Sequence, residues 1–110
     1  MNCVIYLRVS TREQAEGGYS IPAQREACLR FIKDQGWNFI EEYVDHGESA
    51  RSANRPQLQA MLARVKEDGS VNAVIVHKID RLARNTGDHA TIRTILEGRK
   101  VTLVAVTEKI

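Results

Sequence analysis

A serine flanked by arginines follows the first apolar run of the chain. Ser10 comes shortly after the run 3–7, and Arg8 and Arg12 stand two residues to either side of it. A serine hydroxyl is a weak nucleophile and needs an activating partner. The G-x-S-x-G turn of acyl-transfer enzymes is absent, and no histidine is near Ser10 in the sequence. Guanidinium groups suit a different chemistry, in which the transition state spreads negative charge over phosphoryl oxygens.

Arginines also gather in the segments that follow the next two apolar runs. The chain has eleven arginines and five lysines. Six of the arginines fall in the segments RVSTREQ, DHGESARSANR and KIDRLARN, namely Arg8, Arg12, Arg51, Arg55, Arg81 and Arg84. Arginine grips phosphate through paired hydrogen bonds. Codon usage has no reason to sort arginines by their place in a fold, so the distribution favours a phosphate site.

The sequence offers no pattern for a metal ion or a cofactor. The three histidines share no ligand spacing with one another or with the two cysteines. No G-x-G-x-x-G loop follows the first apolar run. We therefore expect no metal site, no cofactor, and reduced core thiols at Cys3 and Cys28.

Apolar runs alternate with helical patterns and predict one α/β domain over residues 1–110. The runs lie at residues 3–7, 37–44, 71–76 and 101–106. Three of them are nearly continuous Val, Ile and Leu, which is typical of parallel strands buried on both faces. The order β-α-β-α-β-α-β predicts a three-layer fold with a mainly parallel four-stranded sheet. A five-stranded mixed sheet is the alternative.

Capping signals set the ends of the expected helices. These helices cover about residues 21–35, 55–68 and 88–97. Ser20 can cap the first, Pro22 fits its first turn, and Gly36 can end it. Asn54 is expected to cap the second, with Gln57 three residues on as in a capping box. Gly98 follows the third.

Arg55 stands where the second helix is expected to begin. A helix N-terminus carries partial positive charge, so a cation there costs about 0.3–1 kcal/mol. In open α/β sheets, ligands bind beyond the carboxyl ends of the strands. An incoming phosphate is therefore expected to meet the helix amino end and Arg55 together.

Three separated motifs resemble one family. RVSTREQ after an apolar strand, D-x-G-x-S with R-P about ten residues on, and KIDRLARN resemble the catalytic domain of the serine recombinases, the resolvase/invertase family. The resemblance covers essentially the whole chain. Within the family, the motifs of this sequence are most similar to those of the large serine integrases and transposases. It implies that serine attacks a DNA phosphodiester, forms a 5′-phosphoserine link and frees a 3′-hydroxyl. Strand exchange and religation follow, without ATP or metal.

The resemblance implies a role for each matching residue. Ser10 is the implied nucleophile. Arg8 is implied to contact the scissile phosphate and help activate Ser10, and Arg55 to bind the non-bridging oxygens. Arg81 and Arg84 are implied to complete the phosphate cage, with Arg81 near the leaving oxygen.

Further polar residues are implied to support this group. Asp80 would orient an arginine or move a proton, and the two roles stay open. The supporting polar positions are Tyr6, Gln14, Gln24 and Ser49. Structural alternatives remain: Tyr6 could be a core residue, Asp80 and Arg84 could form a helix-surface pair, and Ser10 could be a turn or capping serine.

The resemblance also implies partners. DNA is the expected substrate, and the full-length protein is expected to form a homodimer and a synaptic tetramer. Family members continue into a dimerising helix and a DNA-binding region, whereas this sequence stops at VTEKI. We therefore expect a catalytic fragment that does not recombine DNA alone. No apolar run reaches the ~18–20 residues of a membrane span, and no signal peptide is evident, so we expect the cytoplasm.

Two other function classes stay open. An acyl or phosphoester hydrolase could pair Ser10 with His46 or His77. His77 ends the third apolar run, where a packed strand histidine is the favoured interpretation. A non-catalytic α/β regulatory or nucleotide-binding module is the third class, although it lacks a glycine-rich phosphate loop.

Overall fold

Strands and helices alternate along the described part of the chain, as the sequence predicts. The computed structural model describes residues 1–10, 20–47, 55–78 and 86–107. The elements in chain order are β1 (Asn2–Ser10), α2 (Ile21–Gln35), β2 (Asn38–Gly47), α3 (Pro56–Glu67), β3 (Ala73–Val76), α5 (Thr86–Gly98) and β4 (Thr102–Ala105). Strands β1 and β2 run further toward their carboxyl ends than their apolar runs, because polar residues continue the pairing there.

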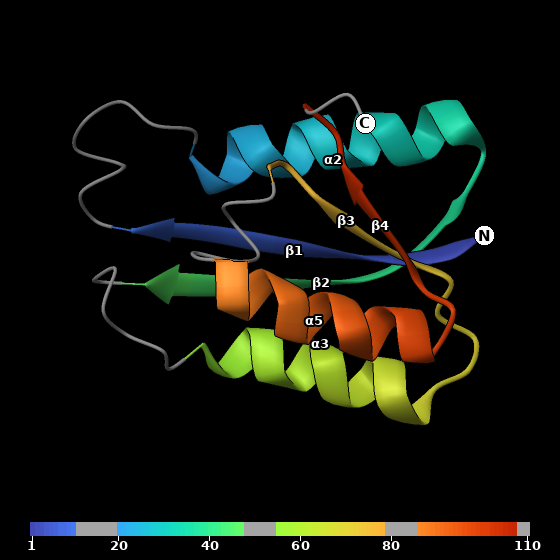
Figure 1. The fold of residues 1–110 in the computed structure, drawn as a ribbon. Helices are drawn as coiled ribbons and strands as arrows, with labels where there is room; N and C mark the ends of the chain where they lie inside the picture. Colours follow the sequence, from blue (N-terminus) through green and yellow to red (C-terminus); the bar gives the residue numbers. More distant parts are fainter. Residues whose placement is uncertain (11–19, 48–54, 79–85, 108–110) are drawn as a thin grey trace.

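The described strands form one parallel sheet in the order β2-β1-β3-β4. Helix α2 covers one face, and α3 and α5 cover the other (Figure 1). The predicted three-layer α/β fold is confirmed, with four parallel strands among the described residues. Figure 1 also shows that the arrowheads of β1 and β2 point to the same edge of the sheet, at the side where α2 and α3 begin.

The core lies on both faces of the central strands. Residues 3–7 of β1 are all 0% exposed, as their apolar run predicts. Val4 and Tyr6 pack with residues of α3 and α5, and the intervening side chains pack with residues of α2. Strand β4 departs from the prediction of burial on both faces, because Leu103 and Val104 are only half-buried. Its position at the edge of the sheet leaves it one neighbouring strand.

Helix α2 begins and ends where its capping signals predict. The Ser20 hydroxyl accepts the N–H of Ala23 at 3.3 Å, and Gly36 adopts the left-handed conformation with φ of 71°. None of the described helices is long and apolar enough to cross a membrane.

The predicted caps of the other two helices are wrong. Arg55, not Asn54, is the N-cap of α3, and its side chain makes no capping hydrogen bond. The capping box with Gln57 is therefore not formed, because a carboxylate from β2 bonds to the Gln57 amide instead. Gly98 is the last residue of α5 and does not lie beyond it.

Candidate active site

Strand β1 carries Ser10 to the carboxyl edge of the sheet. Ser10 is the last residue of β1 and pairs with Gly47 of β2, so it lies within the strand and not just beyond it. Five predicted site residues lie outside the described residues: Gln14, Ser49, Asp80, Arg81 and Arg84. Four have described side chains: Tyr6, Arg8, Gln24 and Arg55.

Two of the predicted arginines are buried beside one tyrosine. Arg8 is 7% exposed and Arg55 is 6% exposed. Burial raises the pKa of Tyr6, its hydrogen bond to Asp45 raises it further, and the charges of Arg55 and Arg8 act in the opposite direction. Both guanidinium groups thus lie within electrostatic reach of a single buried hydroxyl. Two segments that are distant in sequence meet at this edge, as the arginine pattern predicts.

Asp45 of β2 links β1 to the start of α3 through hydrogen bonds. One carboxylate oxygen, Oδ2, accepts the Tyr6 hydroxyl at 2.8 Å and the Leu58 amide at 3.0 Å. The other, Oδ1, accepts the Gln57 amide at 3.0 Å. Asp45 is 5% exposed and lies opposite Arg8 in the strand register. Sequence reasoning did not select this residue for the site, although the D-x-G-x-S motif begins with it.

These bonds correct one expectation about phosphate binding. The sequence suggests that phosphate would meet the amino end of α3 together with Arg55. However, the amides of Gln57 and Leu58 already donate to Asp45, and Pro56 has no N–H. The amides of Gln57 and Leu58 are therefore already occupied and do not join Arg55 in binding a phosphate.

Helix α2 braces the same edge from the other face of the sheet. Gln24 is 0% exposed, and its Nε2 donates to the backbone carbonyl of Arg8 at 3.0 Å. The next residue, Arg25, forms two hydrogen bonds of 2.7 and 2.8 Å with the carboxylate of Glu42 in β2. Gln24 thus holds the strand two residues before Ser10, which agrees with a supporting position.

The chain matches the model of the family described as "Resolvase, N terminal domain" over residues 3–110. It belongs to the resolvase family. The predicted family, the serine recombinases, is confirmed, and so is the predicted class of enzyme, one that transfers DNA strands.

Relatives of this resolvase domain come from a bacterium and a phage. It is 39% identical over 105 residues to "Putative DNA recombinase" of Bacillus subtilis (strain 168), an alignment that covers 93% of this chain and 20% of that protein. The domain thus spans one fifth of that relative's length. It is also 46% identical over 66 residues to "Uncharacterized immunity region protein 3" of Bacillus phage phi105, which covers 60% of this chain and 80% of that protein.

Two solved structures share the whole fold of the resolvase domain. The N-terminal catalytic domain of TP901-1 integrase superposes with a TM-score of 0.89 at 30% identity, covering 100% of this chain and 81% of that one. A resolvase family site-specific recombinase from Streptococcus pneumoniae gives a TM-score of 0.84 at 34% identity, covering 100% and 74%. Both likenesses extend over the edge that carries Ser10.

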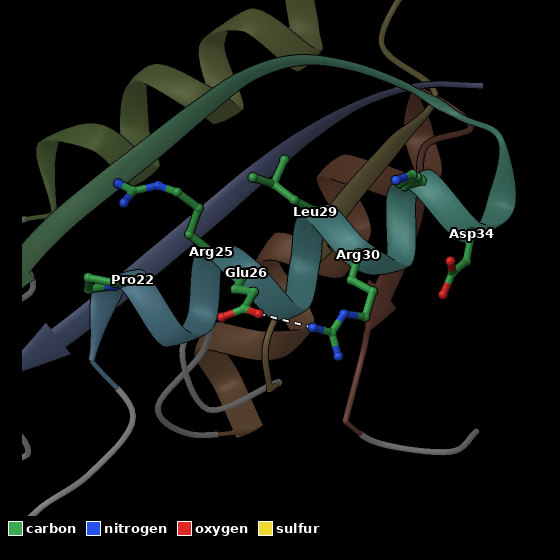
Figure 2. Close-up of a pocket in the computed structure, with 7 residues that line it drawn as sticks. Pro22, Arg25, Glu26, Leu29, Arg30 and Asp34 are labelled. Carbon is green, nitrogen blue, oxygen red and sulfur yellow. Dashed lines mark hydrogen bonds and ion pairs between the residues drawn. The ribbon is translucent and has the colours of Figure 1, made fainter.

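Two further features concern the alternative functions and the surface of the domain. The resolvase domain packs His77 at 3% exposure after β3, where its backbone carbonyl accepts the Thr107 hydroxyl at 2.8 Å. This fits the packed-histidine interpretation. An open hollow on the outer face of α2 holds the Glu26–Arg30 ion pair at 3.0 Å and contains none of the predicted site residues among its described lining (Figure 2). The described residues contain no group of metal-ligating side chains.

Proposed function

We propose that this domain performs the phosphoryl-transfer steps of site-specific DNA recombination. The Ser10 Oγ attacks the phosphorus of a DNA phosphodiester, the bond from phosphorus to the 3′ oxygen breaks, and a 5′-phosphoserine forms. The serine gives up its proton, and the released 3′ oxygen takes one up. Religation reverses these steps with a 3′-hydroxyl as nucleophile. The phosphoserine link conserves the bond energy, so ATP is not consumed.

One observation carries the proposal. Arg8 and Arg55 are buried together at the edge where β1 ends in Ser10. Preorganised cations stabilise a phosphoryl transition state without rearranging during the reaction. In the proposal, Arg8 contacts the scissile phosphate and Arg55 the non-bridging oxygens. The proposal also assigns Arg81 and Arg84 to the phosphate cage, and Asp80 to orienting an arginine or moving a proton.

Recombination itself needs more than this domain. The proposed enzyme acts on attachment or resolution sites in cytoplasmic DNA as a homodimer that pairs into a synaptic tetramer. In that proposal, residues 1–110 are the N-terminal catalytic domain of a longer recombinase. The isolated domain is then expected to attack DNA weakly and to complete no strand exchange.

A substrate with an activated leaving group tests the first step in this chain alone. Duplexes of random sequence would carry a sulfur atom in place of the bridging 3′ oxygen. Because a thiol is far more acidic than an alcohol, sulfur leaves without help from a general acid. We expect a covalent protein–DNA adduct, detectable on denaturing gels and placed on Ser10 by mass spectrometry.

The matched variants are Ser10→Ala and Ser70→Ala. Ser70 is an exposed serine bonded to Asp68, far along the chain from the site. We expect adduct from the wild type and Ser70→Ala, and none from Ser10→Ala. No adduct from the wild type, or equal adduct from Ser10→Ala, contradicts the proposal. Hydrolysis of small esters without adduct would favour the hydrolase with His46 or His77.

A further inference from the structure

On the outer face of α2, charged side chains surround one leucine. The side of the helix that faces the sheet is formed by the buried residues Ile21, Gln24, Cys28 and Ile32. The open hollow on the other side is lined by the half-buried Leu29 and by charges of both signs (Figure 2). From the amino to the carboxyl end of the helix, these charged residues are Arg25, Glu26, Arg30, Lys33 and Asp34.

The amino-terminal half of this face has its charges paired within the chain. Glu26 forms an ion pair with Arg30 at 3.0 Å, and both side chains are 71% exposed. Lys33 and Asp34 lie one turn further along, are exposed, and form no ion pair with another residue that the structure describes. The face therefore offers an unpaired base and an unpaired acid to a partner.

The order of the charges is complementary to itself when it is reversed. We consider two copies of α2 packed antiparallel, with a twofold axis between residues 29 and 30. Glu26 then lies opposite Lys33 of the second copy, and Arg25 lies opposite Asp34 of the second copy. Each pair occurs twice, because a twofold interface uses the same surface from both copies. All four contacts join opposite charges.

The centre of the face also suits a second copy better than it suits DNA. Leu29 of each copy lies beside Arg30 of the other, whose apolar stem covers the leucine while its charged end stays in water. Glu26 and Asp34 place two negative charges on the face, and these repel the phosphates of a nucleic acid. The mixture of charges thus favours a protein surface of the same pattern.

We propose that the outer face of α2 is a docking surface for a second copy of this chain, packed antiparallel on the same helix. The inference goes beyond the proposed function and does not rest on it. Helix α2 has 15 residues and is about 22 Å long, so two such helices bury less than about 1,200 Å², the range of transient contacts. The contact therefore forms when copies are held at a high effective concentration.

Sedimentation equilibrium of the domain tests this contact without DNA. We expect a reversible dimer whose fraction rises up to about 1 mM, a concentration typical of tethered partners. Glu26→Lys and Lys33→Glu each place like charges opposite one another twice across the axis. We expect each substitution alone to raise the Kd of the dimer by at least about 10-fold.

An equimolar mixture of these two variants decides the antiparallel order. In a mixed dimer, both contacts between positions 26 and 33 join opposite charges again, with the signs exchanged. We therefore expect the mixture to associate about as strongly as the wild type, although neither variant associates alone. Recovery on mixing cannot come from a change in the fold of either variant.

Glu97→Lys on α5 is the matched control. It breaks the exposed Arg93–Glu97 ion pair, which has the same i,i+4 spacing as Glu26–Arg30 and a length of 3.2 Å. We expect this variant to associate like the wild type. Thermal melting of each variant shows whether it is folded. If Glu26→Lys does not fold, Lys33→Glu alone decides, and a Kd equal to that of the wild type overturns the inference.

Three other results would also overturn it. The first is a wild type that stays monomeric at about 1 mM. The second is a mixture of Glu26→Lys and Lys33→Glu that associates no more than its two parts, since the pairing across the axis would then be wrong. The third is a monomeric wild type whose binding to duplex DNA is weakened by Lys33→Glu, which would assign this face to DNA.

Discussion

The hydroxyl of Tyr6 makes a hydrogen bond whose free energy can be measured in isolation. Tyr6 is 0% exposed and donates to Asp45 at 2.8 Å. A buried bond to a charged acceptor contributes about 1.5–3 kcal/mol. Tyr6→Phe keeps the ring and removes the donor, so we expect the free energy of unfolding to fall by about that amount in urea titrations.

Tyr43 offers the matched control for this residue. Its hydroxyl donates at 3.2 Å to Glu41, an exposed carboxylate. Water replaces such a bond readily, so Tyr43→Phe is expected to cost about 1 kcal/mol or less. Equal losses in the free energy of unfolding from the two substitutions would show that the buried Tyr6–Asp45 bond stabilises the fold no more than an exposed one.

Individual residues were predictable where their signal is local. Arg8 and Arg55 stood out through residue type and motif, and their burial at one edge agrees with that prediction. Asp45 was missed because its partners are remote in sequence: 12 and 13 residues to the two amides and 39 to Tyr6. A side chain that caps a helix from a neighbouring strand leaves no pattern that can be read one segment at a time.

Among the elements, helix ends show the same division. Helix α2 has its bounds written in adjacent residues, Ser20 and Gly36, and the structure matches them. The side chain that caps α3 is Asp45 of strand β2. The residues next to the helix therefore gave a wrong prediction, a cap at Asn54. The apolar run of β4 predicted a strand buried on both faces. The sequence pattern shows which residues are apolar but not how many strands lie beside them, and β4 has one neighbouring strand.

The end of α5 carries a strain that the sequence hides. Lys100 is the one non-glycine residue with positive φ, 58°, in the described part of the chain. Its amide donates to the carbonyl of Glu97 at 3.1 Å, which closes the helix end. Left-handed backbone costs a side-chain-bearing residue about 1 kcal/mol. Lys100→Gly is therefore expected to raise the free energy of unfolding by about 0.5–1 kcal/mol in urea titrations.

The control is a lysine-to-glycine substitution that is expected to change the free energy of unfolding in the opposite direction. Lys66 is an exposed lysine within α3, where backbone torsions are helical. Lys66→Gly is expected to lower the free energy of unfolding by about 0.5–1 kcal/mol. If Lys100→Gly is also destabilising, the lysine side chain stabilises the helix end by more than its backbone strain costs.

At the scale of the whole molecule, the direction of the strands decides where charged residues lie, which the overall composition does not show. The net charge is only +2, which does not distinguish a DNA enzyme. All four described strands run the same way, so the segments after β1, β2 and β3 all leave from one edge. The alternation of apolar runs with helical patterns was enough to predict a mainly parallel sheet, and the burial of Arg8 and Arg55 agrees with the arginines expected at its carboxyl edge. The contacts that fix Arg8 and Arg55 there depend on side-chain packing and were not predictable.

The two arginines at this edge lead to a prediction about metal ions. Phosphoryl transfer needs positive charge beside the non-bridging oxygens, and many enzymes supply it with bound magnesium. Here two buried guanidinium groups are already fixed at the edge that carries Ser10. We therefore expect the adduct yield on sulfur-containing duplexes to be the same in excess EDTA as in magnesium. Ser10→Ala, without adduct in either condition, sets the background. Loss of adduct under chelation that magnesium restores would show that guanidinium charge alone does not stabilise the transition state, and that the arginines of this edge serve to hold the DNA.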